Sequence, residues 1–140
     1  MGILGTGIDI VEICRITGVI GRRPLFKNRV YTRDEIAYID ANAAGPQHAA
    51  GIFAAKEAVL KACGRGLKGV GWKDVEVLRD GLGKPYVVLH NRAKALAEER
   101  GIEKIHISIS HEREYAIAQA IAEGCDTDED CGCVDDQKNR

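Results

Sequence analysis

Two carboxylates and a lysine stand out because each interrupts a stretch that is otherwise apolar. Asp9 lies in an N-terminal segment rich in β-branched residues. A carboxylate in such a segment must be paired, hydrated or bound to a metal, because burying it alone is very costly. Glu57 and Lys61 lie four positions apart in an alanine-rich segment and share one face of the helix expected there. Together the three residues are candidates for a functional site.

This set of side chains suits the handling of a phosphate ester with a divalent cation. Magnesium takes one or two carboxylates, keeps several waters and completes its octahedral shell with substrate phosphate. A lysine then stabilises the charge on the transferring or leaving phosphate. The alternative for Glu57 and Lys61 alone is a surface salt bridge worth a few tenths of a kcal/mol. The apolar surroundings and the presence of Asp9 favour a site.

The chain has no Walker loop, HExxH or GxSxG motif, and no protein nucleophile is evident. This pattern favours direct transfer to an acceptor hydroxyl, for which the enzyme supplies position and charge.

The elements that must position these residues begin with a strand over residues 1–13 and a long helix from about Gln47 to Cys63. The helix is apolar around most of its circumference, which predicts a buried core helix. Gly64-Arg65-Gly66 ends it, since glycine suits the left-handed cap. Between them, Thr32 and Glu35 form a capping box that predicts a helix to about residue 42.

The second half of the chain is rich in expected strands. Apolar alternation and turn signals predict a hairpin of strands 75–79 and 86–90, a helix over 91–100, and strands over 104–110 and 115–122. The predicted fold is α+β, with an antiparallel sheet packed around one long buried helix.

Length and composition indicate one ordinary globular domain. The chain has 140 residues, of which 45% are hydrophobic and 29% charged, with a net charge of −1. No apolar run approaches the roughly 18 residues of a membrane span, and the N-terminus lacks the plan of a signal peptide. We therefore expect a cytoplasmic protein that does not enter a membrane.

The C-terminal residues differ in composition from the rest. Residues 124–140 have a net charge of −4 and three of the five cysteines, Cys125, Cys131 and Cys133. Three thiols without a nearby histidine do not make a recognisable zinc spacing. We expect a folded domain over residues 1–123 and a flexible acidic tail over 124–140. Cys14 and Cys63 lie in apolar contexts and are expected to be reduced core thiols.

Residues 14–33 contain six basic side chains and no acid. The basic residues are Arg15, Arg22, Arg23, Lys27, Arg29 and Arg33. Such a segment is either a solvated face or a surface that receives an acidic partner.

Four segments in order resemble the holo-[acyl-carrier-protein] synthases, the small trimeric 4′-phosphopantetheinyl transferases. They are Gly7-Ile8-Asp9-Ile10-Val11-Glu12-Ile13 with Arg15, Phe53-Ala54-Ala55-Lys56-Glu57-Ala58 with Lys61-Ala62, Gly83-Lys84-Pro85, and Ser108-Ile109-Ser110-His111-Glu112. The resemblance covers about residues 1–122. It implies the phosphopantetheinyl transferase fold and transfer of 4′-phosphopantetheine from coenzyme A to a serine of apo-acyl carrier protein, in fatty acid biosynthesis. Adenosine 3′,5′-bisphosphate would be released.

The resemblance also implies a role for each matching residue. Asp9 and Glu57 match magnesium ligands, Lys61 matches a lysine at the pyrophosphate of coenzyme A, and all three match catalytic positions. Glu57 would orient the attacking serine or accept its proton, directly or through water. The residues expected at coenzyme A are Lys61, Gly64, Gly66, Pro85 and His111, and those expected at the acyl carrier protein are Arg15, Arg22 and Arg29. A homotrimer with shared sites is also implied.

Two features depart from the family pattern. Many members have arginine, a phosphate contact, where this chain has Ile52, so Arg65 or Lys68 would have to replace that contact. The acidic tail after Glu123 has no expected counterpart.

Two other classes of function compete with a transferase. The first is a non-catalytic module that binds coenzyme A or an acidic helix through the basic segment, but binding alone does not need two metal-binding carboxylates. The second is a nucleic-acid binder, which is disfavoured by the 5% aromatic content and by the absence of a recognised motif. We therefore expect no nucleic-acid partner.

Overall fold

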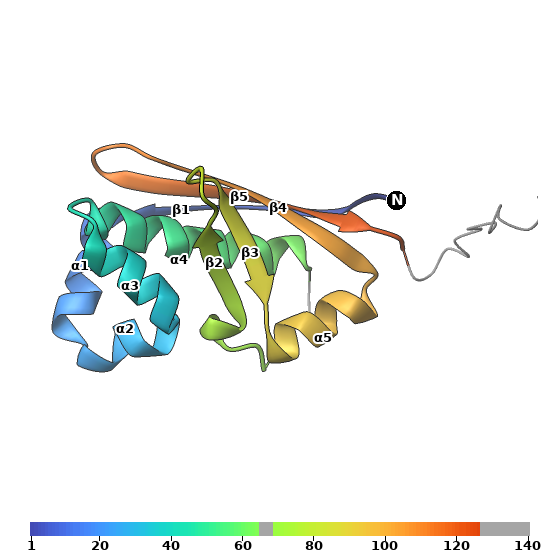
Figure 1. Cartoon of the computed structure of the whole chain (residues 1–140), viewed down its shortest axis with the longest axis horizontal. Coiled ribbons are helices and arrows are strands. Elements are labelled where there is room, and N and C mark those ends of the chain that lie inside the picture. Colours follow the sequence, from blue (N-terminus) through green and yellow to red (C-terminus); the bar gives the residue numbers. More distant parts are fainter. Residues whose placement is uncertain (65–68, 127–140) are drawn as a thin grey trace, which may run out of the picture.

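Helix α4 (Gly45–Ala62) is the central element, and the other elements pack around it. The structure is a computed structural model that describes residues 1–64 and 69–126. The other elements are β1 (Gly2–Glu12), α1 (Ile13–Arg22), α2 (Pro24–Val30), α3 (Arg33–Ala41), a 3₁₀ turn η1 (Trp72–Asp74), β2 (Val75–Arg79), β3 (Pro85–Leu89), α5 (Asn91–Glu99), β4 (Ile102–His111) and β5 (Tyr115–Gly124). Figure 1 shows α4 lying along the long strands, with α1 to α3 gathered at one end.

Strands β1, β5 and β4 form an antiparallel sheet in that order, and β2 pairs with β3 in a separate hairpin. The expected α+β class and the antiparallel packing around one long helix are confirmed. The single sheet implied by the sequence is instead two sheets, both of which contact α4.

The register of β1 turns Asp9 towards α4. Asp9 lies opposite Ala118 of β5, and the alternation of a strand places Gly7 and Val11 on the same inner face. A Cβ atom at Gly7 would overlap the carbonyl oxygen of Ala58, so the glycine allows α4 to approach the strand closely. This close approach brings a carboxylate on the strand within reach of side chains on the helix.

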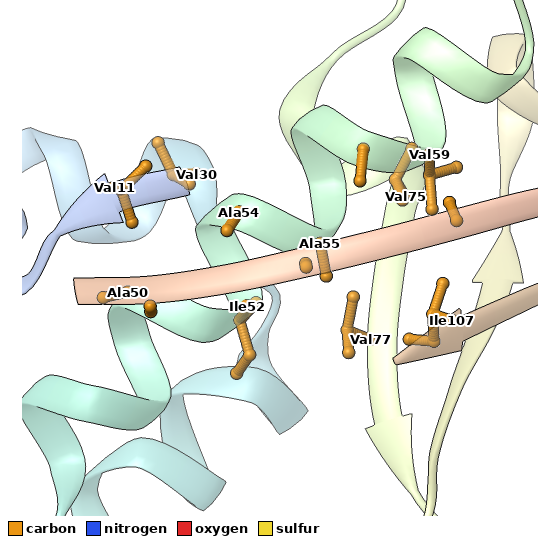
Figure 2. Close-up of a cluster of buried hydrophobic side chains, with 14 of the residues drawn as sticks. Val11, Val30, Ala50, Ile52, Ala54, Ala55, Val59, Val75, Val77 and Ile107 are labelled. Carbon is orange, nitrogen blue, oxygen red and sulfur yellow. The ribbon is translucent and has the colours of Figure 1, made fainter. Parts of the chain in front are cut away.

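The core between helix and sheets is built mostly from small side chains. Ala54, Ala55 and Val59 of α4 belong to one buried hydrophobic cluster with Val75, Val77 and Ile107, which Figure 2 labels. Small residues let the elements lie close together.

The basic segment forms α1 and α2, two helices that the sequence analysis did not predict. Pro24 opens α2, where a proline lacks no needed donor. The capping box is confirmed, since Thr32 Oγ1 accepts from Glu35 N and Thr32 N donates to Glu35 Oε1. Helix α4 begins two residues before the expected Gln47, because Gly45 and Pro46 belong to its first turn.

Two further expectations meet different outcomes. Gly64 has a φ of +83°, which confirms the left-handed cap after α4. Cys63 is buried as expected, but Cys14 is exposed on α1 and is not a core thiol.

None of the helices among residues 1–64 and 69–126 combines the length and apolarity that a membrane crossing requires. The expected tail from residue 127 onward lies outside the described residues.

Candidate active site

Asp9 and Lys61 meet between β1 and α4, as the sequence predicts. Lys61 Nζ lies 3.2 Å from Asp9 Oδ1 and donates to the carbonyl oxygen of Ile8 at 2.8 Å. Because β1 is an edge strand, its outer carbonyls are free to accept such a bond. The Asp9 side chain is 18% exposed and that of Lys61 53%, so the pair is open to a ligand from solvent.

Glu57 completes the group from the same helix. Partial burial raises the pKa of Glu57, the negative charge of Asp9 raises it further, and Lys61 opposes both effects. The repulsion shows that the two carboxylates lie close enough to feel each other's charge. A divalent cation between them would remove this repulsion.

The donor set fits magnesium. Among residues 1–64 and 69–126, no group of three or more His, Cys, Asp or Glu side chains could hold a metal ion. A cation held by Asp9 and Glu57 would therefore take its other ligands from water and substrate phosphate. That shared shell is the usual mode for Mg²⁺ in phosphate-transfer enzymes.

The raised pKa of Glu57 predicts a stability change in the metal-free protein. A carboxyl whose pKa is raised by folding does not affect stability at low pH, where it is protonated in both the folded and the unfolded state. As the pH rises through the raised pKa the carboxyl ionises in the fold, and this ionised form destabilises the fold at neutral pH. We expect Glu57→Gln to raise the melting temperature at pH 7 in EDTA and to have little effect at pH 4. Calorimetry at both pH values measures this, and an equal or lower melting temperature at pH 7 would contradict a raised pKa for Glu57.

The residues expected at coenzyme A fall into two groups. Gly64 follows α4 and its N–H donates to the carbonyl oxygen of Lys61 at 3.0 Å, and the preceding Cys63 carbonyl accepts a bond from Arg100. Gly66 lies outside the described residues, as do Arg65 and Lys68. Ile52 is only 1% exposed, so this position offers no surface contact at all.

His111 and Pro85 lie away from Asp9 and Glu57 within one chain. The His111 ring is 6.4 Å from that of His48, which is roughly 14 Å from Glu57 along α4. Pro85 pairs with Arg79. Partial burial is the larger cause of the lowered pKa of His48, and the positive charge of Arg79 lowers it further. His48, Arg79 and His111 thus form a second basic group, which the sequence analysis did not assemble.

The sequence analysis also missed a buried ion pair. Lys56 Nζ lies 2.7 Å from Glu35 Oε1, and both side chains are fully buried. Burial lowers the pKa of Lys56, and Glu35 opposes that shift. The only available signal was a second charge next to Glu57 in an apolar helix.

The residues expected at the acyl carrier protein are exposed on α1 and α2. Leu25 is 69% exposed and helps to line a surface pocket. The pocket is lined by Arg22, Arg23, Pro24, Leu25, Phe26 and Arg29. Lys27 instead pairs with Asp40 at 2.6 Å, which partly neutralises it. An apolar side chain surrounded by arginines suits an acidic partner with an exposed apolar residue.

Comparison with known proteins identifies the family. A sequence model of the 4′-phosphopantetheinyl transferase superfamily matches residues 5–120. The chain belongs to this superfamily. A holo-[acyl-carrier-protein] synthase of Alkaliphilus metalliredigens is 50% identical over 86% of this transferase and 98% of its own length. The Clostridium novyi synthase is 46% identical over 99% of both chains, so it extends past Glu123. The expectation that the tail has no counterpart is wrong for that relative.

Solved structures of holo-[acyl-carrier-protein] synthases share this fold. The synthase from Plasmodium yoelii has a TM-score of 0.77 at 36% identity, covering 89% of this chain and 97% of its own. The Bacillus anthracis synthase, solved in complex with CoA (3′,5′-ADP), has a TM-score of 0.73 at 34% identity, covering 89% of this chain and 100% of its own.

Proposed function

We propose that the transferase uses Mg²⁺ held by Asp9 and Glu57 to move 4′-phosphopantetheine from coenzyme A to a serine of apo-acyl carrier protein. The serine oxygen bonds to the phosphorus attached to pantetheine, and the bond from that phosphorus to the bridging oxygen breaks. The products are holo-acyl carrier protein and adenosine 3′,5′-bisphosphate. The reaction supplies the carrier for fatty acid biosynthesis.

The convergence of Asp9, Glu57 and Lys61 supports this proposal. Asp9 and Glu57 are 48 positions apart in the sequence. The close approach of β1 and α4 nevertheless brings them near enough for the charge of Asp9 to raise the pKa of Glu57. Lys61 already donates to Asp9 and has an exposed ammonium, so it can turn to a phosphate when a cation takes its place beside Asp9. Charge on the leaving bisphosphate would then be met by Lys61.

The serine proton has two routes that the geometry leaves open. Glu57 accepts it directly, or a water bound beside Glu57 accepts it.

The activity is tested by incubating the full chain with coenzyme A, Mg²⁺ and apo-acyl carrier protein and then measuring intact mass. We expect the carrier to gain one phosphopantetheine group. Coenzyme A binding without any change in the carrier would instead favour the non-catalytic module.

We further propose that Arg15, Arg22 and Arg29 receive the acyl carrier protein. Arg22→Glu is then expected to raise the KM for the carrier about tenfold, with less effect as salt rises, because exposed charges are screened over about 8 Å at physiological ionic strength. The KM for coenzyme A should not change. Arg92→Glu reverses an exposed charge on α5 and serves as the control. Equal rises in both KM values for Arg22→Glu would refute the docking role.

We also propose a homotrimer in which neighbouring chains complete each site. The outer face of the sheet exposes Ile8, Ile10, Tyr115 and Ile117, which is a large apolar area for a monomer. In a closed ring, the second basic group of one chain, together with the nearby Pro85, would face Asp9 and Glu57 on the next chain. A cytoplasmic location remains our prediction.

A further inference from the structure

The ammonium of Lys61 is the positive charge that the structure places at Asp9. Its Nζ lies 3.2 Å from Asp9 Oδ1 and donates to the carbonyl oxygen of Ile8 at 2.8 Å. The Asp9 side chain is only 18% exposed, and a carboxylate with so little hydration needs a positive or hydrogen-bonding partner. Lys61 provides that partner from the last turn of α4.

The same ammonium also acts on Glu57. Partial burial and the negative charge of Asp9 raise the pKa of Glu57, whereas the positive charge of Lys61 lowers it. Lys61 therefore offsets part of the repulsion between the two carboxylates. A divalent cation held by Asp9 and Glu57 would perform the same electrostatic task.

The contact between Lys61 and Asp9 is one that can open. The Lys61 side chain is 53% exposed, and a lysine has a flexible four-carbon stem. Water can replace the ammonium at the Ile8 carbonyl, because β1 is an edge strand. An ion pair this exposed also holds its members together only weakly. A second cation at Asp9 can therefore displace the lysine.

Two cations at one carboxylate weaken each other's binding. An ammonium and a divalent cation that share Asp9 repel strongly, because they would be only a few ångströms apart. A phosphate near the site removes this conflict, since it offers the ammonium a charge-assisted hydrogen bond of its own. The position of Lys61 thus affects the binding of both a cation and a phosphate.

We infer that Lys61 competes with Mg²⁺ for Asp9 and gives up the carboxylate when a phosphate of coenzyme A provides another partner. The lysine thereby couples the two ligands, because the cation binds weakly until coenzyme A draws Lys61 away. Such coupling is reciprocal, so the cation strengthens coenzyme A binding by the same factor. The inference rests on the proposed function for the identity of the two ligands, whereas the Asp9–Lys61 contact does not depend on it.

The test uses Lys61→Met, which removes the ammonium and keeps a flexible unbranched side chain. Mn²⁺, which accepts the same oxygen ligands as Mg²⁺, is titrated into the full chain without coenzyme A while electron paramagnetic resonance reports the free ion. We expect the variant to bind Mn²⁺ about tenfold more tightly than wild type, because the repulsion between the two cations is removed. Equal Mn²⁺ affinity of the two proteins would overturn the inference.

The coupling is measured by repeating the titration with saturating coenzyme A. Coenzyme A should raise the Mn²⁺ affinity of wild type by a larger factor than that of Lys61→Met, because only wild type has a competing ammonium to release. An equal factor in both proteins would show that the coupling does not pass through Lys61, and would overturn the inference.

Lys94→Met is the matched control. It removes a positive charge from an exposed residue of α5 that lines a pocket with β3 and β4. Its Mn²⁺ affinity should equal that of wild type. The same gain in Lys94→Met as in Lys61→Met would show that net charge, and not contact with Asp9, sets the affinity, and would overturn the inference.

Acetylation of wild-type lysines, read by peptide mass spectrometry, follows Lys61 itself. Mg²⁺ alone should increase the labelling rate of Lys61, coenzyme A with Mg²⁺ should decrease it again, and the labelling of Lys94 should stay constant. Unchanged labelling of Lys61 at Mg²⁺ concentrations that displace bound Mn²⁺ would overturn the inference. These measurements need no carrier protein, so a wild-type chain that leaves the carrier unmodified would count against the proposed function alone.

Discussion

We expect Asp9→Ala to lower kcat for transfer to the carrier by about a thousandfold, and Glu57→Gln to do the same. Each change removes one of the two protein ligands for the cation that stabilises charge in the transition state, and loss of one such stabilising group commonly costs 10²–10³-fold or more. Steady-state kinetics at saturating coenzyme A and several Mg²⁺ concentrations measure the effect.

The matched control for these variants is Glu12→Gln. Glu12 is the next carboxylate on β1, but it lies on the outer face, exposed to solvent. Its kcat should stay within about twofold of wild type, because an exposed charge away from the cation contributes little. Full activity of Asp9→Ala at ordinary Mg²⁺ concentrations would show that the metal is held elsewhere.

Mixed assemblies give the second large effect. Asp9→Ala and His111→Ala chains should each be poorly active alone, yet an equal mixture reassembled into trimers should regain about a quarter of wild-type activity. The reason is that one site in four would combine an intact Asp9 with an intact His111 from the neighbouring chain. Activity of the mixture and light scattering, which should report about three times the 15.2 kDa chain mass, are the measurements.

A mixture of Asp9→Ala with Glu57→Gln chains is the control for complementation. Both residues belong to the same half of the site, so no combination of these chains restores an intact pair. Recovery in this control mixture would contradict the placement of Asp9 and Glu57 in one half of the site. A fully active monomer, or no recovery in the Asp9→Ala/His111→Ala mixture, would rule out sites shared as proposed, and the metal chemistry of Asp9 and Glu57 would be unaffected by either of those two outcomes.

The sequence predicted the parts of the fold that rest on local signals. The capping box of Thr32 and Glu35, the turn between β2 and β3 and the alternation in β4 depend on neighbouring residues, and all are confirmed. Asp9 and Glu57 were proposed as site residues because a charge in an apolar segment is conspicuous by itself. Their meeting depends on Gly7, whose missing side chain lets helix and strand approach.

The features that the sequence did not predict depend on contacts between distant segments. Lys56 looked like one more charge beside Glu57, and only the folded chain turns it inward to Glu35, 21 positions earlier. The separation of β2 and β3 from the main sheet likewise depends on how both sheets wrap α4. The grouping of His48 with His111 depends on the ends of α4 and β4 meeting.

Metal binding by the site itself tests the central claim most directly. Mn²⁺, which accepts the same oxygen ligands as Mg²⁺, can be titrated into the protein with coenzyme A present while electron paramagnetic resonance reports the free ion. The account predicts one bound Mn²⁺ per chain, displaced by excess Mg²⁺, with binding lost in Asp9→Ala and retained in Glu12→Gln. Unchanged Mn²⁺ binding by Asp9→Ala would contradict the assignment of Asp9 and Glu57 as the metal site.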